Sequence, residues 1–407
     1  PSPTDPMSAM IARLKELSLQ VKHAFWETQP VVQFQDLGNA ALSEGPIEPQ
    51  IPVSELRQEP YDLPPPFEWT TCDIDAGEED WTDLHGLLTD HFMESENSRY
   101  DFSKEYLLWA LHPPGFHRSW LLGVRAKASK KLVAFIAAVP VRIRIRSEVV
   151  PTAKISFLCL HERVRSKRLT PVMIREIARR VHLENVWQGA FASDKVLTFP
   201  VTIFRSWNRF LNVAKLVDVD FFERGPRMTT SRAVKLYKLP DKAPTPGFRK
   251  MRADDVPKVT RLVGNHLRQF VVGAEFHEAD VSHWLVPRPD VVDTYVVECP
   301  ESREITDLCS FYHLSMPVLG NAYHSALRVA RCYYNVATAT PPARLAADAL
   351  AAAKATGADV FVAFDVMDNN EAVFEELKFE RGCRQLNFYL YNYRQNEILL
   401  PSDFGIV

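Results

Sequence analysis

The sequence predicts an α/β protein built from two similar halves, and three observations lead to this prediction. The first is a strand, a loop, a helix and a second strand in succession over residues 154–191. The second is the same order over residues 333–364, with a Thr-Pro step at the start of both helices. The third is a proline-rich stretch, 240–247, that separates the two units. We therefore expect two mixed sheets flanked by helices and related by a pseudo-twofold axis.

The first unit carries the strongest local signals. Residues 155–160 are apolar and rich in β-branched and aromatic side chains, which predicts a buried strand. A loop with four basic residues within 163–168 follows, and Thr170 and Pro171 then supply an N-cap and a first-turn proline. Apolar residues at helical spacing over 174–181 give the helix one core face. A basic loop at a helix N-terminus favours an anion such as a pyrophosphate.

The remaining elements are predicted from shorter signals. Seven prolines over 46–66 exclude a helix or a central strand and predict an extended segment. We expect helices over 7–26 (amphipathic), 81–93, 102–111 (capped by Ser103) and 344–355 (with Gly357 as C-cap), and another after 247–251 capped by Asp254 or Asp255. Further strands are expected over 120–124, 132–146, 186–191, 247–251, 333–337 and 359–364.

Composition narrows the classes of function. With 407 residues, 46% of them hydrophobic, the chain can bury a large core. The formal net charge of -3 gives no global attraction to nucleic acid or to an anionic membrane. Six cysteines without a C-x-x-C pair predict a reduced, cytoplasmic setting and no structural zinc. The apolar run 132–141 is too short to span a bilayer, no signal peptide is visible, and the start at Pro1 suggests a trimmed form of a longer protein.

Three local features have both a functional and an ordinary interpretation. His161 and Glu162 begin like a zinc-protease H-E-x-x-H motif, but the fifth residue is Arg165, so no metal site is expected. Cys159 could carry an acyl group, yet its place between two leucines favours a buried, inert thiol. Arginines alternate with apolar residues over 141–146; without interleaved aromatic residues, a solvated strand face is favoured over an RNA-binding stripe.

Residues 154–171 resemble the signature of the N-myristoyltransferase family, E-I-N-F-L-C-V-H-K-x-L-R-x-K-R-L-A-P. They share its Phe-Leu-Cys core, its histidine, its Arg-x-Lys-Arg-Leu loop and its proline. Segments such as HAFWETQPV (23–31), FEWTTCD, KLYKLPDKAPTPGFRKM and FYLYNYR are similar to plant-type members of the family. Because the resemblance covers residues 23–407, the chain is identified as a member of that family.

The resemblance implies an enzyme that moves myristate from myristoyl-CoA to the N-terminal glycine amine of peptides and nascent proteins. It implies the family's doubled acetyltransferase-like (GNAT-like) fold. The main-chain amides of Phe157 and Leu158 would form the oxyanion hole, in which each donor is typically worth roughly 3 kcal/mol of barrier. The base would be the C-terminal carboxylate, here that of Val407. Proton transfer from an α-amine (pKa ~8) to a free carboxylate (pKa ~3.5) is uphill by roughly 6 kcal/mol in water, so the carboxylate must be buried.

The end of the chain departs from the family pattern. Plant-type members end S-E-L-G-L-V-L-L, whereas residues 402–407 read S-D-F-G-I-V, two residues fewer by that alignment. The carboxylate would then lie up to ~7 Å short, at about 3.3 Å per residue, unless the terminus repacks or the sequence is trimmed.

The resemblance also divides the chain and assigns the acyl-CoA site. It implies an arm over the acyl-CoA (1–26), an acyl-CoA-binding domain (27–239) and a peptide-binding domain (240–407). Only the first unit has a basic loop, which agrees with one acyl-CoA per chain. The residues expected to contact acyl-CoA are His23, Ala24, Phe25, Trp26, Leu158, Cys159, Leu160, Ser166, Lys167, Arg168, Leu169 and Thr170.

Other departures cluster where the family binds its peptide. The glycine loop K-F-G-x-G-D-G reads K-F-E-R-G-C-R over 378–384, and Y-T-A-G-V reads F-A-S-D-K over 191–195. The acidic loop within 91–102 is shorter, a tryptophan–histidine pair reads W-N at 207–208, and a pocket asparagine is Val362. Each lost polar contact costs about 1 kcal/mol. The residues expected to contact the peptide are Tyr100, Phe102, Phe191, Ala192, Asn208, Tyr312 and Gly382.

Three functions therefore stay open from the sequence. The first is an active glycylpeptide N-tetradecanoyltransferase. The second is a catalytically impaired relative that binds acyl-CoA, a partner peptide or both. The third is a transferase that acylates a different amine. In each case we expect a cytoplasmic monomer that uses no metal and binds no nucleic acid.

Overall fold

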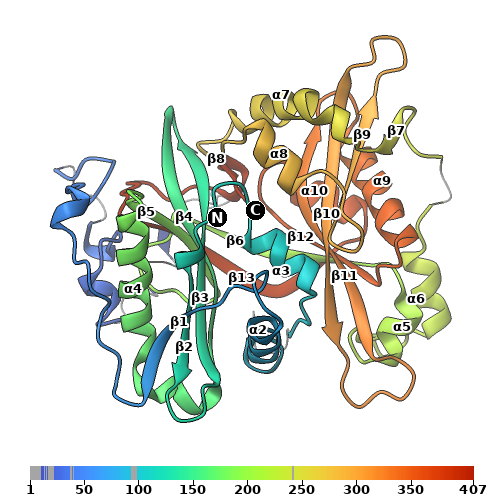
Figure 1. Cartoon of the computed structure of the whole chain (residues 1–407). Helices are drawn as coiled ribbons and strands as arrows, with labels where there is room; N and C mark the ends of the chain where they lie inside the picture. The colour runs from blue at the N-terminus through green and yellow to red at the C-terminus, as the bar shows by residue number, and fades with distance from the viewer. Residues whose placement is uncertain are drawn as a thin grey trace.

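A single mixed sheet organises the protein. The computed structural model describes residues 11, 12, 14, 16, 23–36, 39, 41–92, 99–240 and 243–407. In this part of the chain, 14 strands join into one continuous sheet with helices on both faces (Figure 1). None of the helices in these described ranges is both long enough and apolar enough to cross a membrane.

The first half of the sheet contains four antiparallel strands followed by one parallel strand. Its elements are β1 (Phe67–Thr71), α2 (Glu78–His91), α3 (Lys104–Leu111), β2 (Leu121–Ala126), β3 (Leu132–Ile145), β4 (Glu148–Leu160), α4 (Leu169–Leu183) and β5 (Gln188–Ser193). Strands β1 to β4 pair antiparallel in sequence order, and β5 lies parallel to β4. Side chains alternate along β3, so Ile136 faces Ile177 of α4 while Phe135 faces Leu84 of α2.

The second half repeats this arrangement. Its elements are β7 (Phe248–Lys250), α7 (Val256–Leu267), β8 (Val272–Ala274), α8 (Glu278–Trp284), β9 (Val292–Glu298), β10 (Ile305–Pro317), β11 (Ala326–Ala337), α9 (Pro342–Ala355), β12 (Val360–Phe364) and α10 (Glu371–Glu376). Strands β7, β9, β10 and β11 pair antiparallel, and β12 is parallel to β11. Leu308 packs with Val259 of α7, whereas the adjacent Cys309 packs with Ala349 of α9.

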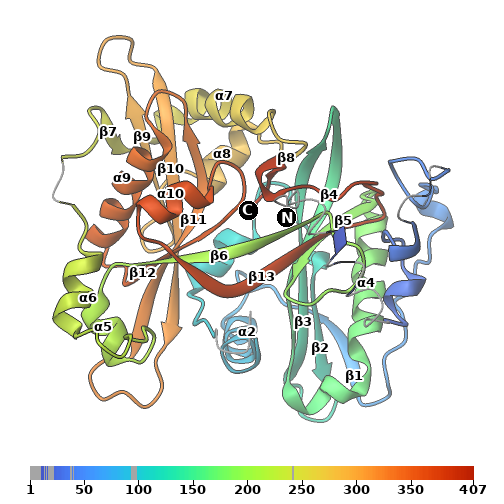
Figure 2. The same cartoon turned by 180° about the vertical axis from the view of Figure 1, so that it is seen from behind.

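The two halves exchange a strand with each other. The joining elements are β6 (Thr202–Phe210), α5 (Val213–Asp218), α6 (Thr230–Tyr237) and β13 (Glu380–Tyr391). β13 pairs with β5 of the first half, β6 pairs with β12 of the second half, and β6 and β13 pair with each other. Figure 2 shows these two strands side by side across the middle of the molecule. The repeat confirms the predicted α/β fold with two similar halves, but the two expected sheets are joined into one through β6 and β13. The boundary at 239/240 stays a prediction.

Two predictions about short segments were confirmed and one was wrong. The Ser103 hydroxyl caps α3 by accepting from the Tyr106 N–H at 3.1 Å, as expected. The stretch 46–66 contains no strand and only a 3-10 turn, Val53–Glu55. The N-cap prediction for Thr170 was wrong. The 3-10 helix Glu162–Lys167 runs directly into α4, so the cap position falls on Arg168 in a left-handed conformation (φ 56°).

The predicted C-cap of α9 is off by one residue, and part of the predicted helix over 7–26 lies outside the described residues. Thr356 is the C-cap of α9, and Gly357 follows it with φ 86°, a conformation that suits a residue without a Cβ. Of the predicted helix over 7–26, residues 11, 12, 14 and 16 are helical, and Leu14 is buried. Residues 7–10, 13, 15 and 17–22 lie outside the described residues. The predicted end at residue 26 was wrong, because a turn at 24–25 leads into the 3-10 helix Trp26–Thr28.

The interpretation of 141–146 as a solvated strand face was wrong for Arg144. This side chain is buried and donates hydrogen bonds to the main-chain oxygens of Arg146, Leu267 and Phe270. The reason is tertiary: β8 extends the sheet beside the end of β3, and the C-terminal end of α7 contacts the guanidinium. Carbonyl oxygens at the end of α7 thus take the place of water around the guanidinium.

A buried ion-pair cluster anchors the proline-rich segment to α4. Glu176 is fully buried and accepts from the guanidinium groups of Arg179 (2.7 and 2.9 Å) and Arg180 (2.8 Å) and from the Tyr61 N–H (3.1 Å). Burial opposes ionisation of Glu176. The hydrogen bonds from the two arginines and from Tyr61 outweigh it and hold the pKa of the carboxyl below its usual value.

We expect Glu176→Gln to lower the free energy of unfolding by about 3 kcal/mol at pH 7, because it leaves Arg179 buried without its counter-charge. A depressed pKa gives stability that is complete above the unfolded value of ~4.3 and is lost as the pH falls through the folded pKa. The difference from the wild type should therefore narrow below about pH 4. Urea unfolding across this range measures it, with the exposed Glu223→Gln as matched control. Equal midpoints for both variants at pH 7 would contradict the assignment.

Candidate functional site

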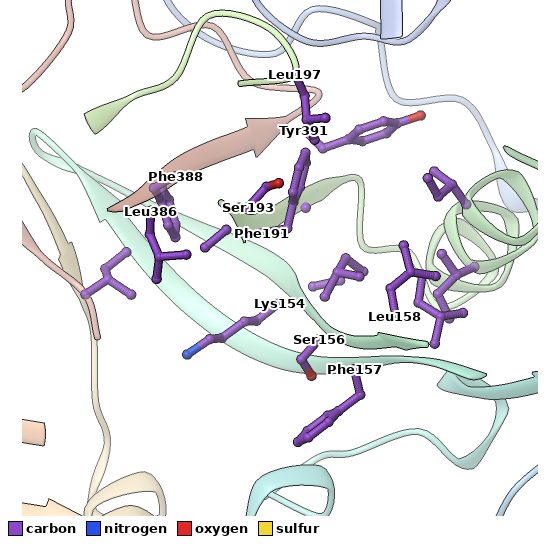
Figure 3. A pocket seen from close by; sticks show the side chains of 18 of the residues that line it. Lys154, Ser156, Phe157, Leu158, Phe191, Ser193, Leu197, Leu386, Phe388 and Tyr391 are labelled. Atoms are coloured by element: carbon purple, nitrogen blue, oxygen red, sulfur yellow. The ribbon is translucent and has the colours of Figure 1, made fainter. Parts of the chain in front are cut away.

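The site begins where two central strands part. β4 and β5 pair only at Thr152–Gln188, Ala153–Gly189 and Lys154–Ala190. Beyond Lys154, one edge of β4 has no neighbouring strand within the described residues. A cavity of about 630 Å³ fills the opening between β4, β5, α4 and β13. Figure 3 shows Lys154, Ser156, Phe157 and Leu158 along one strand, with Phe191 and Ser193 on the neighbouring strand.

A β-bulge interrupts the pairing of β4 with β3, next to the opening. Ala137 of β3 pairs with Ser156 and Phe135 pairs with Cys159, so Phe157 and Leu158 together oppose one residue of β3. Phe157 adopts a left-handed conformation (φ 54°), which is uncommon for an aromatic residue. A bulge takes main-chain groups out of the strand ladder, and β5 has already left this edge. Phe157 and Leu158 thus line the cavity at a point where β4 has no strand on its β5 side within the described residues.

A second cavity, of about 250 Å³, lies on the other side of the bulge. Its walls come from β3, α3, α8 and β11, and aromatic side chains such as Trp109, Trp284 and Tyr333 line it. The two cavities meet at a junction of eight residues that line both: Phe92, Lys154, Ser156, Phe157, Tyr312, Phe388, Ile406 and Val407. The site is therefore two chambers joined at the bulged strand.

The C-terminal segment is held firmly at this junction. β14 (Phe404–Gly405) pairs with β8, and the Phe404 ring is buried against Phe388, with ring centroids 4.7 Å apart. A Cβ on Gly405 would come within 2.8 Å of the Phe270 ring, so the chain passes through a tight gap. Val407 consequently lies between the halves, where Figure 1 marks the C-terminus.

Lys154 points from β4 into the junction. Its Nζ donates to an oxygen of Val407 at 3.0 Å, and no Asp or Glu side chain of the described residues pairs with it. Protein surrounds the side chain except where it opens onto the cavities, and this burial lowers the pKa of Lys154 to about 8. His182, also on the cavity wall, has a pKa lowered to about 4 by burial and is neutral at physiological pH.

The basic turn before α4 carries positively charged side chains that are exposed to solvent. The His161 ring caps the 3-10 helix by accepting from the Arg163 N–H at 3.2 Å. Ser166, Lys167 and Arg168 are exposed, and no described carboxylate pairs with Lys167 or Arg168. Leu169 is buried beneath them in the α4 core. The first amides of a 15-residue helix thus lie beside unpaired positive charge, an arrangement suited to phosphate.

The structure brings only some of the expected acyl-CoA residues to the cavity. Trp26 and Leu158 line it, and Trp26 stacks on Phe191 at 5.1 Å. Cys159 points to the opposite face of the sheet because the bulge reverses the alternation, and its thiol lies 3.6 Å from the Leu87 oxygen of α2. The others lie outside the cavity walls: His23, Ala24 and Phe25 on the arm, Leu160 in the core beside α4, and Ser166, Lys167, Arg168, Leu169 and Thr170 at the basic turn.

The expected peptide residues separate into two groups. Phe191, Ala192 and Tyr312 line the larger cavity. Phe102 packs edge-on against Phe157 with ring centroids 5.4 Å apart, and the Tyr100 hydroxyl accepts a hydrogen bond from Arg331 at 2.9 Å. Both residues therefore contact the cavity wall without lining the cavities themselves. By contrast, Asn208 of β6 and Gly382 of β13 line neither cavity in the part of the chain that the structure describes. Of the acidic loop within 91–102, residues 93–98 lie outside that part.

Sequence reasoning missed Lys154 and the wall formed by α4. The α4 positions Ile174, Ile177 and Ala178 were assigned only to the core, yet they also line the larger cavity. For Lys154 a signal was present: a lysine precedes an apolar strand where the family signature has a glutamate. Its meaning depends on Val407, which is 253 positions away in sequence.

The parted strands, the bulge between two chambers and the exposed basic turn belong to a chain that is similar to known acyltransferases. Two family models match the chain: the N-terminal domain of myristoyl-CoA:protein N-myristoyltransferase over residues 46–204 and its C-terminal domain over 218–403. Glycylpeptide N-tetradecanoyltransferase 1 of Arabidopsis thaliana is 53% identical over 404 residues, covering 98% of this chain and 93% of the relative. Glycylpeptide N-tetradecanoyltransferase 2 of Bos taurus is 43% identical, covering 92% of this chain and 74% of its own length.

A solved structure agrees with these sequence matches. N-myristoyltransferase of Saccharomyces cerevisiae with bound myristoyl-CoA superimposes with a TM-score of 0.89 at 33% identity, covering 95% of this chain and 99% of the yeast chain. This chain therefore belongs to the myristoyl-CoA:protein N-myristoyltransferase family. The resemblance to plant-type members and the expected fold are both confirmed.

The direction of Cys159 gives a chemical prediction. Burial raises the pKa of the Cys159 thiol to about 12, whereas the Cys383 side chain is exposed. Iodoacetamide at pH 8 should therefore modify Cys383 in the folded protein, and should modify Cys159 only after denaturation. Peptide mass spectrometry measures both sites in one sample. Equal labelling of the two cysteines in the folded protein would show that Cys159 faces the cavity.

Proposed function

We propose that this chain transfers the myristoyl group of myristoyl-CoA to the α-amine of an N-terminal glycine on a peptide or nascent protein. The supporting observation is the bulge in β4 beside the opening, which lies between two chambers that meet at one junction. One chamber suits an apolar acyl chain, because aliphatic and aromatic side chains of α4, β5 and β13 line it. The relatives' names supply the identities of donor and acceptor.

The amides of Phe157 and Leu158 act as the oxyanion hole in this proposal. The tetrahedral intermediate concentrates negative charge on the former carbonyl oxygen, and fixed N–H donors stabilise it without reorganising. The left-handed Phe157 supports this role, because strain of this kind is maintained where the surrounding packing holds it. The basic turn with Lys167 and Arg168 binds the coenzyme's phosphates at the start of α4. The carboxylate of Val407 as base stays a prediction.

One observation favours the catalytically impaired alternative. The loop that replaces the family's glycine loop is engaged in contacts of its own: Glu380 bonds to the Tyr237 hydroxyl, and Arg381 pairs with Glu371. Gly382 packs against Ser206, where a Cβ would come within 2.2 Å of the hydroxyl oxygen. A family member with its peptide loop folded onto its own sheet would bind acyl-CoA but few peptides.

A direct assay separates these two functions. Myristoyl-CoA should raise the melting temperature of the protein under either function. Labelled myristate should appear on a synthetic peptide that begins with glycine, and not on the same peptide with alanine first, only if the chain is an active transferase. Stabilisation without peptide labelling would favour the impaired relative. No stabilisation by myristoyl-CoA would contradict both.

The phosphate site has its own test. The double variant Lys167→Ala with Arg168→Ala should weaken myristoyl-CoA binding by about tenfold, since it removes two charged donors. Its affinity should also depend less on salt than that of the wild type, because fewer ionic contacts remain to be screened. Titration calorimetry at two salt concentrations measures both effects. Lys127→Ala with Lys131→Ala, two exposed lysines near the β2–β3 turn, is the matched control. Unchanged affinity in the first variant would refute the assignment of the basic turn.

A further inference from the structure

We propose that one end of the second half is a docking surface for a membrane with anionic headgroups. This surface, called the basic-apolar face below, combines two parts of the chain: residues 223–238, which include α6, and the tip of the β10–β11 hairpin, 318–325. Both parts lie at the same end of the molecule in Figures 1 and 2. Docking at this face does not depend on the proposed function.

Side-chain contacts hold the hairpin tip beside the α5–α6 segment. The Asn321 side chain donates to the main-chain oxygen of Asp218, the last residue of α5, at 2.8 Å. The His324 ring lies 3.7 Å from the Asp218 carboxylate. Asn321 also accepts from the N–H groups of Tyr323 at 2.9 Å and His324 at 3.0 Å. These contacts give the tip a defined conformation next to the basic segment.

The hairpin tip carries the two most exposed large hydrophobic side chains of the described residues. Leu319 is 85% exposed and Tyr323 is 92% exposed. Two more, Val234 at 42% and Leu236 at 41%, lie on the outer side of α6. The described chain exposes eight large hydrophobic side chains, so half of them lie on this one face. Such a concentration of exposed apolar side chains indicates an interaction site.

Positive charge accompanies these apolar side chains. Residues 223–238 contain five basic residues and one acidic residue, Glu223, which gives the segment a net charge of +4 although the whole chain has -3. The five basic side chains are exposed, and no Asp or Glu of the described residues forms an ion pair with any of them. They are Arg224, Arg227, Arg232, Lys235 and Lys238. The segment is therefore complementary in charge to anionic headgroups.

The combination of charge and apolar surface favours a membrane over nucleic acid. Lysine and arginine near an anionic bilayer are attracted to its headgroups, and apolar side chains beside them enter the interface. Tyrosine is typical of this position because its ring is apolar and its hydroxyl is polar. Single-stranded nucleic acid needs stacking aromatic residues, and Tyr323 is the only aromatic residue among the exposed large hydrophobic residues of the described chain. Leu319, Val234 and Leu236 offer no stacking surface.

Docking has a consequence for the proposed function. A single myristoyl chain binds a bilayer only marginally and reversibly. A myristoylated product that leaves an enzyme already docked on a membrane meets the bilayer before it diffuses into solution. This consequence rests on the proposed function, whereas the docking itself is tested without any substrate.

The test measures co-sedimentation of the intact chain with vesicles. Vesicles of phosphatidylcholine alone are compared with vesicles that contain about one-third phosphatidylserine. We expect about tenfold tighter binding to the anionic vesicles at low salt, and a smaller difference as added salt screens the headgroups. Leu319→Ser with Tyr323→Ser removes the apolar tip, and Arg232→Gln with Lys235→Gln removes two charges from α6. Each pair should weaken binding to the anionic vesicles by about tenfold.

The matched control is Lys127→Gln with Lys131→Gln, two exposed lysines near the β2–β3 turn, which should bind as the wild type does. All these variants replace exposed side chains, and equal melting temperatures verify that they fold. Equal binding of the wild type to both kinds of vesicle, or binding to neither, would overturn the proposal. The same loss in the lysine control as in the α6 pair would assign the attraction to total charge and not to this face. If the α6 pair instead weakens binding to a single-stranded RNA and leaves vesicle binding unchanged, the face is a nucleic-acid site.

Discussion

The parting of β4 from β5 is the constraint on which the rest of the structure depends. Parallel strands normally continue side by side, and here pairing stops at Lys154. This parting leaves a space beside β4. Helix α4 closes one side of the space, and the bulge at Phe157 takes main-chain groups of β4 out of the strand ladder. The bulge also decides which side chains enter. By reversing the alternation it leaves Leu158 open to the cavity and sends Cys159 to the α2 face.

Strand exchange explains why neither half forms this site alone. β13 comes from the end of the chain yet pairs with β5, and its Phe388 lines both chambers. Tyr312 of β10 reaches the same junction from the second half. The C-terminal segment is then drawn between the halves by its pairing with β8, which itself pairs with β3. An opening within the first half is therefore closed by groups from the second.

The sequence predicts what is local and repeats. Two strand–helix–strand units, the cap at Ser103 and the basic turn before α4 each depend on neighbours in sequence, and each is found in the structure. Prediction from the sequence fails where segments that are far apart in the chain come into contact. The pattern places Arg144 in solvent, whereas the end of α7 contacts it, and it makes Thr170 a cap, whereas the preceding 3-10 helix continues into α4. The contact of Lys154 with Val407 is of the same kind, because no periodicity joins residues so far apart.

Comparison with the other buried charges shows why Lys154 is not explained by folding alone. Glu176 is surrounded by two guanidinium groups, and Arg144 and Arg209 each donate to three main-chain oxygens. These groups have the dense polar contacts that a buried charge needs to be tolerated. Lys154 has three possible donors and one partner, which leaves its charged form poorly compensated and its pKa low. A group kept for stability would gain from a carboxylate nearby or from replacement by an apolar side chain. Lys154 is thus held by fewer hydrogen bonds than these three groups, and it opens onto both chambers.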